Sequence, residues 1–419
     1  MIRDLTSLHN FFREFSLPDA QGQMNLITSS HTISDTINAG GVDYTRYTNE
    51  FWTSKQRQAS RLQEISYRAC FKPQLPRFFI SLLTEPDDIV YDPFSGRGTT
   101  PVEAALMGRQ VISNDINPLS YILTRPRLSP PSLNDIKKRL STINDSEDKC
   151  EIDLSMFYHP DTLKTILGVR DHLIKKSNAN SDDNVDRWIR MVATNRLTGH
   201  SPGFFSVYTL PPNQAVTAER QVKINQKRNQ MPPYRDVRSI ILKKSRALIN
   251  GVDQKQLEHL KKADKTAIFL NEDAGHTSRI PDASVNLTVT SPPFLDIVQY
   301  SSDNWLRCWF NGLDADEISS RITMSRRLEE WENVMSGVFQ ELYRITKNDG
   351  FIAFEVGEVR NGSVNLDEHV IPLGVNVGLL CTCIIINSQE FTKTANIWGI
   401  NNMSCGTNTN RIVLFQKRE

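Results

Sequence analysis

One stretch of the chain, residues 89–115, constrains the fold more than any other. Residues 89–91 are apolar and short, as in a buried strand, and the turn DPFSGRGTT at residues 92–100 follows them directly. Residues 101–106 are typical of a helix, and residues 111–113 of a second strand. A strand, a crossover helix and a second strand make the unit from which doubly wound, mostly parallel α/β sheets are built. We therefore expect an α/β fold with such a sheet at its centre.

The turn carries two glycines, Gly96 and Gly98, between the strand and the helix. Glycine lets a ligand approach the backbone without meeting a side chain. A dinucleotide-binding turn would have three glycines, and a P-loop would have a lysine where this chain has Thr99. Asp115 ends the next strand, 19 positions after Gly96, where its carboxylate can accept hydrogen bonds from both hydroxyls of a ribose. A plain tight turn and a helix-capping aspartate stay open as alternatives.

Five further segments have the pattern of buried strands, which gives seven strands in all. They span residues 267–270, 285–289, 351–356, 384–386 and 412–415. Helical spacing of apolar residues predicts helices over residues 53–69, 77–83 and 328–346. The sequence thus predicts a mostly parallel, seven-stranded sheet with helices between the strands.

The second and third expected strands are separated by a long connection, whereas a connection in an α/β sheet normally takes only about 2–6 residues. The excess predicts an inserted, largely helical region. We divide the chain into an N-terminal helical extension (1–66), a first, cofactor-binding part of the catalytic domain (67–125), the inserted target-recognition region (126–265) and a second part of the catalytic domain (266–419).

The motif Ser291-Pro292-Pro293-Phe294 follows the strand at residues 285–289. Prolines have no N–H, fix the backbone and leave carbonyl oxygens free as acceptors. Such acceptors can hold the protons of an amine and direct its lone pair at an electrophilic methyl group, while the aromatic ring stacks on a base. A proline turn without chemistry is the alternative, and the glycine turn and Asp115 weaken it.

In combination, these motifs resemble those of the DNA amino-methyltransferases, the family that methylates N4 of cytosine or N6 of adenine. The resemblance covers residues 71–125 and 266–417. It implies a Rossmann-like methyltransferase fold, S-adenosyl-L-methionine as the cofactor and direct transfer of the methyl group without a covalent enzyme intermediate. Serine in the first place of the catalytic motif is usual in N4-cytosine members, where N6-adenine members usually have Asp or Asn. The cofactor motif precedes the catalytic motif, unlike in many N4-cytosine enzymes, so adenine N6 stays open as the alternative target.

The resemblance also implies roles for individual residues. The cofactor would be bound by Phe71, Lys72, Asp92, Phe94, Gly96, Gly98, Thr99, Asp115, Ile116 and Asp273. In this set Phe71 and Lys72 close over the carboxylate end of the cofactor, Asp115 holds the ribose, and Asp273 accepts from the adenine amine. The catalytic motif would be Ser291, Pro292, Pro293 and Phe294. Trp398, Asn401 and Asn402 are unranked candidates for the wall of the base pocket.

The inserted region has a composition suited to nucleic acid. Residues 218–265 include 13 Lys and Arg against 5 Asp and Glu, although the net charge of the whole chain is only +1. Basic residues interspersed with Gln and Asn can contact phosphates and base edges. We expect double-stranded DNA to contact Arg196, His200, Lys223, Lys227, Arg228 and Arg235. A solvated charged surface is the alternative, and we prefer it for residues 255–265; a packed core position also stays open for His200.

Composition limits the remaining possibilities. The 419 residues are 39% hydrophobic and 23% charged, as in ordinary globular proteins. No run reaches the roughly 18 apolar residues of a membrane span, and the first residues do not have the pattern of a secretory signal, so we expect a cytoplasmic protein. The six cysteines lack paired spacing, which favours structural thiols, and we expect no metal.

Rival activities differ from this interpretation in what they require. Methylation of cytosine at carbon 5 uses a thiolate, and the chain has no Pro-Cys pair to supply it. RNA or protein-glutamine methylation would not need the insertion, and a DNA-binding module without activity would not need the cofactor residues. The sequence therefore predicts site-specific methylation of cytosine N4 in duplex DNA, with a restriction endonuclease acting on the same site as a candidate partner.

Overall fold

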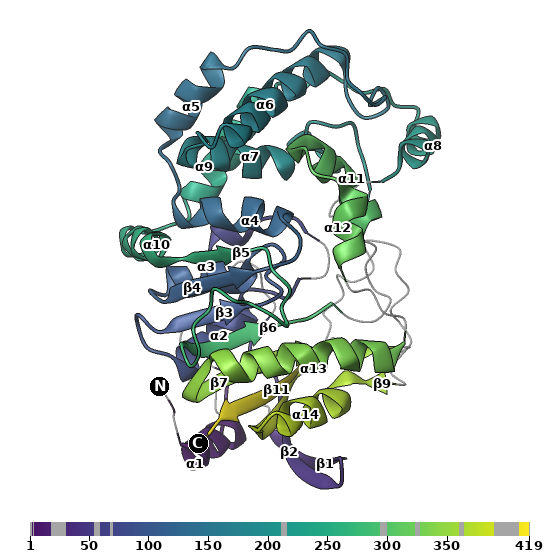
Figure 1. Cartoon of the computed structure of the whole chain (residues 1–419). Helices are drawn as coiled ribbons and strands as arrows, with labels where there is room; N and C mark the ends of the chain where they lie inside the picture. Colours follow the sequence, from purple (N-terminus) through teal and green to yellow (C-terminus); the bar gives the residue numbers. More distant parts are fainter. Residues whose placement is uncertain are drawn as a thin grey trace.

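The structure is a computed structural model that describes residues 2, 4–17, 31–53, 59–67, 70–210, 216–293, 300–322, 327–359, 364–388 and 410–418. Within these ranges the chain forms a large central sheet, helices on both faces of the sheet, and a helical part beyond one of its edges (Figure 1). Among the described helices, none is both long and apolar enough to cross a bilayer.

The central sheet has nine strands in the described residues, in the order β1-β2-β10-β11-β7-β6-β3-β4-β5. The strands are β1 Ile33–Ala39, β2 Val42–Asn49, β3 Ile89–Asp92, β4 Gln110–Asn114, β5 Ile268–Leu270, β6 Val285–Thr290, β7 Thr346–Val356, β10 Leu379–Asn387 and β11 Asn410–Lys417. Strands β7, β6, β3, β4 and β5 are parallel, and β11 lies antiparallel between β7 and β10. A separate antiparallel pair is formed by β8 (Glu358–Val359) and β9 (Val364–Asn365). The expected doubly wound α/β fold is thus confirmed.

The sheet is larger than expected because the N-terminal region adds a hairpin to it. All seven expected strands are present, as β3, β4, β5, β6, β7, β10 and β11. Strands β1 and β2 pair antiparallel, and β2 joins the edge of the sheet beside β10. The expectation of a helical extension over residues 1–66 is therefore right for α1 (Leu5–Arg13) and wrong for residues 33–49.

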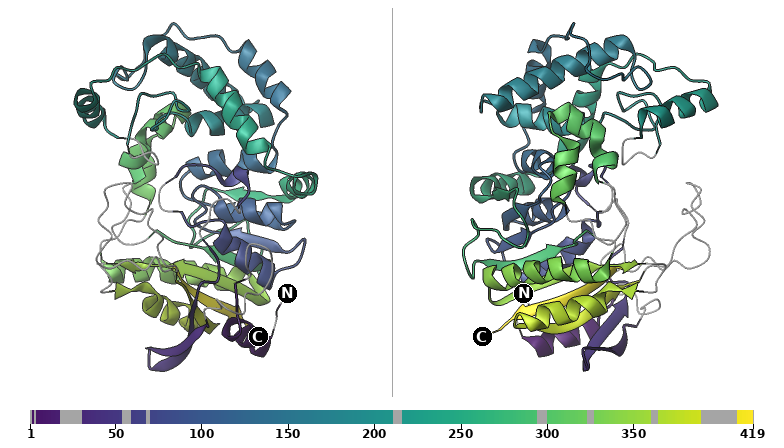
Figure 2. Two further views of the ribbon diagram at one scale, coloured as in Figure 1. Left: turned by 180° about the vertical axis from the view of Figure 1, so that it is seen from behind. Right: turned by 45° about the vertical axis from the view of Figure 1, so that its right-hand side comes forward.

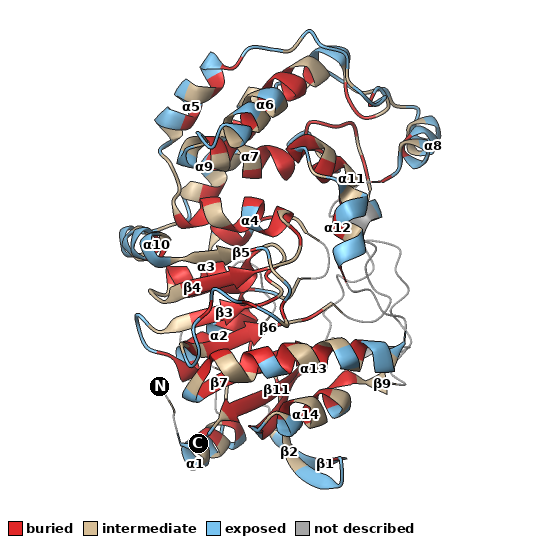
Figure 3. Ribbon diagram, in the orientation of Figure 1, coloured by how far each residue is buried: buried red, intermediate tan, exposed pale blue. Residues whose placement is uncertain are grey.

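Hydrophobic cores lie on both faces of the sheet. In β7, Phe351 and Ala353 belong to one core, and Ile352 and Phe354 to the other. Successive side chains of a strand point to opposite faces, so a strand that is covered on both faces is apolar throughout. Figure 3 accordingly shows the middle of the sheet as buried.

Helices from distant parts of the chain cover the two faces. Helices α2 (Gln74–Leu83), α3 (Thr99–Leu106) and α10 (Gln254–Thr266) pack together on one face. Helices α13 (Leu328–Ile345) and α14 (Leu366–Asn376) lie side by side on the other face (Figures 1 and 2). The expected helices at 77–83 and 328–346 are therefore present as α2 and α13.

The expected insertion lies between β4 and β5 and is helical. It contains α4 (Leu119–Thr124), a 3-10 turn (Arg125–Leu128), α5 (Leu133–Thr142), α6 (Pro160–Asn178), α7 (Asn184–Thr194), α8 (Ala218–Arg228), α9 (Val237–Ile249) and α10. Figure 1 shows α5, α6, α7 and α9 as a layer beyond the β5 edge, and α8 set apart from them. Two later helices, α11 (Tyr300–Asn311) and α12 (Ala315–Arg321), run beside this layer; in α11, Asn311 Nδ2 donates to Thr194 Oγ1 at 2.9 Å.

The expected helix over residues 53–69 is wrong for the described part of that range, which forms only a 3-10 turn at Arg61–Gln63 and extended chain. Two arginines take the carbonyl groups that a helix would use. Arg97 Nη1 donates to the Ile65 carbonyl at 2.7 Å, and Arg127 Nη1 to the Leu62 carbonyl at 3.1 Å. Arg127 is fully buried, and burial lowers its pKa to about 9. These long-range hydrogen bonds, which no local pattern reveals, hold the segment extended.

Candidate active site

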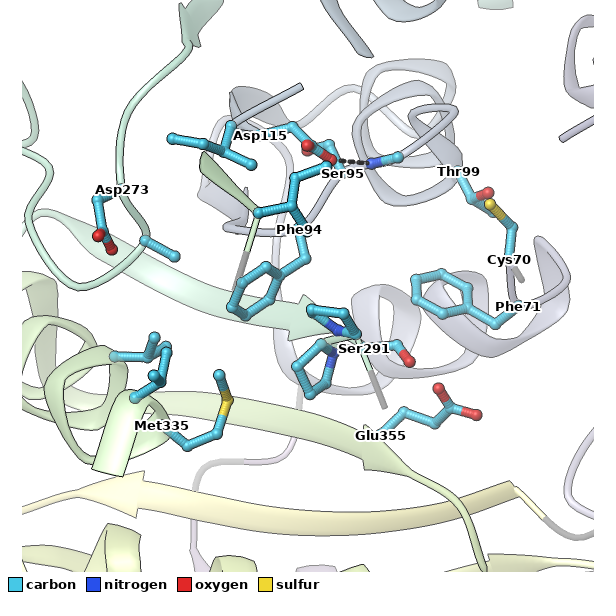
Figure 4. A pocket seen from close by; sticks show the side chains of 18 of the residues that line it. Cys70, Phe71, Phe94, Ser95, Thr99, Asp115, Asp273, Ser291, Met335 and Glu355 are labelled. Carbon is cyan, nitrogen blue, oxygen red and sulfur yellow. Dashed lines mark hydrogen bonds between the residues drawn. The ribbon is translucent and has the colours of Figure 1, made fainter. Parts of the chain in front are cut away.

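A cavity of about 400 Å³ lies at the carboxyl ends of β3, β4, β6 and β7, the edge at which doubly wound sheets bind ligands. Its volume falls within the range of small-molecule sites. Ten residues expected from the sequence line it: Phe71, Phe94, Gly96, Thr99, Asp115, Ile116, Asp273, Ser291, Pro292 and Pro293. Figure 4 shows Asp273 and Met335 at one end of the cavity, and Phe71, Ser291 and Glu355 at the other. The glycine turn and the proline motif, about 190 positions apart in the chain, therefore share one cavity, as a switch-point site requires.

The glycine turn gives the cavity a wall of backbone. Gly96 and Gly98 have φ angles of +52° and +76°, a region that favours glycine. A Cβ on Gly98 would lie 2.1 Å from Thr124 Oγ1, so a side chain does not fit there. Gly98 is not a lining residue; it lets α3 begin at Thr99 tightly against α4.

Asp115 is held at the end of β4 by the backbone around it. Its Oδ2 accepts from the Gly96 N–H at 2.7 Å, drawn in Figure 4, and its Oδ1 accepts from the Asn117 N–H at 2.9 Å. Burial raises the pKa of Asp115 to about 6, and the two N–H groups oppose this shift. An ionised carboxylate offers about four acceptor positions, so both oxygens keep one for a ligand.

Asp92 lies behind the cavity wall and not in the lining. Its side chain is 1% exposed, and its Oδ1 accepts from Thr290 Oγ1 at 2.7 Å and from the Phe94 N–H at 3.1 Å. Burial raises its pKa to about 7. Asp92 thus connects the glycine turn to the residue that precedes Ser291, a structural contact in place of the cofactor contact expected from the sequence.

Ser291 faces a buried carboxylate that the sequence analysis missed. The Ser291 side chain lies near the Glu355 carboxylate at the end of β7 and opposes the rise of its pKa, and Glu355 Oε1 accepts from Asn410 Nδ2 at 2.7 Å. Burial raises the pKa of Glu355. Ser291, Glu355 and Asn410 all line the cavity. A charged residue inside the apolar strand FIAFEV was the available signal in the sequence.

One face of α13 forms a further wall that the sequence analysis missed. Trp331, Val334, Met335 and Val338 line the cavity, and their spacing places them on one face of a helix. Arg321 and Ile322, at the end of α12, also line it. The sequence predicted the helix, but its apolar pattern is the same whether the face contacts a ligand or packs in the hydrophobic core.

One further cofactor residue expected from the sequence does not line the cavity, and four other expected residues fall outside the described chain. Lys72 is exposed and is not among the lining residues of the described chain. Phe294 lies outside the described residues, and so do Trp398, Asn401 and Asn402.

The residues expected to contact DNA fall into two groups. Lys223, Lys227 and Arg228 are exposed on α8, and His200 is exposed in the loop before it. Arg196 instead packs inside the insertion: its guanidinium carbon lies 4.0 Å from the centre of the Phe204 ring, and burial lowers its pKa to about 10.

Arg235 is the second inward-facing residue. It is half-buried, and its backbone N–H and carbonyl both pair with Thr162 Oγ1. The geometry gives Arg196 and Arg235 packing roles, whereas Lys223 and Lys227 are exposed on α8.

Helix α8 is fixed at its base and exposed elsewhere. Gln221 is the buried residue of the helix, and its Nε2 donates to the Tyr208 carbonyl at 3.1 Å. Asn225 Nδ2 donates to the Met156 carbonyl at 2.8 Å, and the Arg228 guanidinium lies 3.7 Å from the centre of the Tyr208 ring. Figure 1 shows α8 on the same side of the molecule as α12 and β9, the side toward which β7 ends. Its contacts thus hold one side of α8 against residues 156 and 208, and its other side is exposed.

Comparison with known proteins agrees with the motifs. Residues 12–122, which include the glycine turn and Asp115, match the family described as DNA methylase. The type II methyltransferase M.MvaI of Kocuria varians is 24% identical over 295 residues, which cover 65% of this chain and 60% of that protein. The type II methyltransferase M.PvuII of Proteus hauseri is 45% identical over 53 residues, 13% of this chain and 16% of that protein. Among solved structures, the rRNA methyltransferase aviRa of Streptomyces viridochromogenes aligns at 10% identity and a TM-score of 0.33, covering 87% of this chain and 93% of that one.

The matches to M.MvaI and M.PvuII span less than two thirds of either relative's length. The matched family segment contains the same turn and carboxylate that the structure places in the wall of the cavity. The chain is thus similar to the DNA methylase family over residues 12–122 and to type II methyltransferases over longer or shorter stretches, and its motifs resemble those of DNA amino-methyltransferases.

Proposed function

We propose that the protein transfers the methyl group of S-adenosyl-L-methionine to an exocyclic amine in double-stranded DNA, and that the amine is N4 of cytosine. The observation that carries the proposal is the single cavity in which the glycine turn, Asp115 and Asp273 meet Ser291-Pro292-Pro293. A site for a group-transfer reaction needs both parts within reach of one another.

The residues present fit this cofactor. Asp115 offers acceptors for two ribose hydroxyls, and Asp273, exposed in the cavity, offers an acceptor for an adenine amine. Ile116 and the apolar face of α13 provide surfaces for an aromatic ring. Phe71 and the backbone of Gly96 would enclose the methionine part. The bound cofactor would supply a methyl group on a positively charged sulfur.

Ser291 and Glu355 are arranged to hold and deprotonate an amine. The Ser291 hydroxyl lies near Glu355 and can donate its proton to that carboxylate, which leaves the Ser291 oxygen to accept a hydrogen bond from the amine. An amine that received the methyl group would carry one proton too many, which the protein would have to take up. The Glu355 carboxylate can receive that proton through Ser291, and burial has already raised its pKa in the direction that favours uptake.

Cytosine is proposed because the motif begins with serine, as is usual in the N4-cytosine members that the sequence resembles. Glu355 lies beside Ser291 in the cavity, so the site contains a carboxylate although the first residue of the motif is not acidic. Adenine N6 is the second candidate, because the matched family is described only as DNA methylase.

Double-stranded DNA is proposed as the substrate, with α8 following its backbone. The helix carries Arg220, Lys223, Lys227 and Arg228 against one acidic residue, Glu219, and only Gln221 is buried. A base inside a duplex cannot enter a cavity, so the target base would be turned out of the helix. A restriction endonuclease of the same sequence specificity is the partner that we infer from the likeness to type II methyltransferases.

Transfer of labelled methyl groups tests the proposal. We expect label from S-adenosyl-L-methionine in unmethylated duplex DNA and not in RNA or protein. Ser291→Ala should lower kcat and leave the Kd of the cofactor within about twofold, because the hydroxyl acts on the amine as it approaches the methyl group. Ser284→Ala, a change outside the cavity on the approach to β6, serves as the matched control. Label in RNA alone, or Ser291→Ala with the kcat of the wild type, would contradict the proposal.

A further inference from the structure

The indole of Trp331 connects the wall of the cavity to the catalytic turn. Trp331 lies in the first turn of α13 and is 4% exposed. Its Nε1–H donates to the Pro293 carbonyl at 3.0 Å. Val334, Met335 and Val338 continue the same helix face along the cavity. One helix face thus contacts both the proposed cofactor site and the proline motif.

This hydrogen bond fixes a rotation that proline leaves free. The ring of Pro293 sets its φ angle, whereas the direction of its carbonyl depends on ψ. The Pro293 carbonyl is partly buried and keeps a donor only in this direction, so the Trp331 N–H holds it there. One of the two acceptor positions of the Pro293 carbonyl is therefore taken by the indole, and the direction of this carbonyl is fixed.

The other acceptors of the motif remain. The Ser291 hydroxyl lies in the cavity near Glu355, and none of the described residues donates to the Pro292 carbonyl. We propose that Trp331 is a positioning residue: by holding the Pro293 carbonyl, it leaves the Ser291 hydroxyl and the Pro292 carbonyl to orient the target amine. This inference rests on the proposed methyl transfer and names the residue that shapes its catalytic turn.

A pair of tryptophan variants tests the inference. Trp331→Phe removes the N–H and keeps an aromatic ring in the wall. The control is Trp305→Phe, which removes a similar hydrogen bond, from Trp305 Nε1 to the Val216 carbonyl at 3.2 Å, outside the cavity. We expect Trp331→Phe to lower kcat about three- to tenfold, the effect of one lost hydrogen bond, with an unchanged Kd for S-adenosylhomocysteine. Trp305→Phe should keep the kcat of the wild type.

The outcomes separate this inference from the proposed function. If the wild type methylates DNA and Trp331→Phe has the same kcat, the positioning role is wrong and the proposed function stands. If Kd for S-adenosylhomocysteine rises in proportion to the fall in kcat/KM, Trp331 only packs the cavity wall, and the inference also fails. A wild type that transfers no methyl group overturns both. Should Trp331→Phe not fold, Trp331→benzothienylalanine keeps the bicyclic ring without the N–H, and the same fall in kcat is expected.

Discussion

Asp115 combines a fixed position with spare hydrogen-bonding capacity. Two backbone N–H groups hold its oxygens, and each oxygen keeps one position for a ribose hydroxyl. Asp115→Asn turns one oxygen into a donor that cannot accept from a hydroxyl. We expect S-adenosyl-L-methionine to bind about 1.5–3 kcal/mol more weakly by calorimetry, the usual contribution of hydrogen bonds to a charged group. The control is Asp171→Asn, an exposed residue of α6 outside this cavity. Equal affinity in wild type and Asp115→Asn would remove Asp115 from the site.

Asp92 makes stability depend on pH in a direction opposite to that of most carboxylates. Burial raises its pKa from 3.8 to about 7, so between these values the folded protein binds one more proton than the unfolded chain. The free energy of unfolding therefore falls as the pH rises through this window. Asn keeps an oxygen that can accept from Thr290 and cannot ionise.

We expect ionisation of the Asp92 carboxyl to lower the free energy of unfolding of the wild type by on the order of 2 kcal/mol between pH 5 and pH 8. Asp92→Asn removes this loss. Urea unfolding across this range measures it. Burial also raises the pKa of Asp115, to about 6, which lowers the free energy of unfolding with rising pH in both proteins. Asp115 therefore does not change the difference in free energy of unfolding between the wild type and Asp92→Asn. If the free energy of unfolding changed equally with pH in the two proteins, burial would not raise the pKa of Asp92.

Individual site residues were predictable where a motif fixes them and not where the fold brings them in. The glycine turn, Asp115 and Ser291 stand in recognisable patterns, and they line the cavity together. Glu355 and Trp331 reach the same place from a strand and a helix whose local patterns indicate only burial. Their partners, Ser291 and Pro293, lie 64 and 38 positions away in the sequence, and only the folded chain reveals such pairs.

At the scale of elements, α8 is the part of the insertion best suited to a phosphate backbone. Lys223 and Lys227 are exposed and four residues apart, so they share one face of the helix. Replacing both with Gln should weaken binding to duplexes of any sequence and reduce the log–log salt slope by about 2 × 0.9, because two phosphate contacts are lost. Fluorescence anisotropy at several salt concentrations measures the slope.

The matched control replaces Lys255 and Lys261 of α10, which are exposed on a helix that packs against α3. The sequence favours a solvated surface there, and the double change should leave the slope as it is in the wild type. A wild-type slope for the α8 variant would place Lys223 and Lys227 on a solvated face as well.

The elements of the sheet were predictable because apolar strands covered on both faces have a strong pattern. The hairpin of β1 and β2 was missed because most of its residues are exposed or half-buried, so it shows little apolar alternation. Its signal was Gly40-Gly41, a dipeptide suited to a two-residue hairpin turn, with φ angles of +63° and +83°. The helix predicted over 53–69 failed for the opposite reason, since its pattern was plausible but Arg97 and Arg127 take its carbonyl groups.

At the scale of the whole molecule, the cavity and the basic helix α8 lie in different parts of the fold. The sheet holds the cavity at its carboxyl edge, and the layer of α5, α6, α7 and α9 lies beyond β5 with α8 projecting from it (Figure 1). Helix α11 follows the catalytic motif in sequence and packs against α6 and α7 of this layer, where Asn311 bonds to Thr194 of the insertion. The part that carries the chemistry is thereby tied to the part proposed to contact DNA.

The identity of the methylated base tests this account most directly. Unmethylated duplex DNA is incubated with the protein and S-adenosyl-L-methionine, digested to nucleosides and analysed by mass spectrometry against N4-methylcytosine, N6-methyladenine and 5-methylcytosine standards. We expect N4-methylcytosine, which disappears with Ser291→Ala and persists with Ser284→Ala. N6-methyladenine alone would contradict the target base and keep the site, whereas 5-methylcytosine, or no methylated base from a folded protein that binds the cofactor, would contradict the central claim.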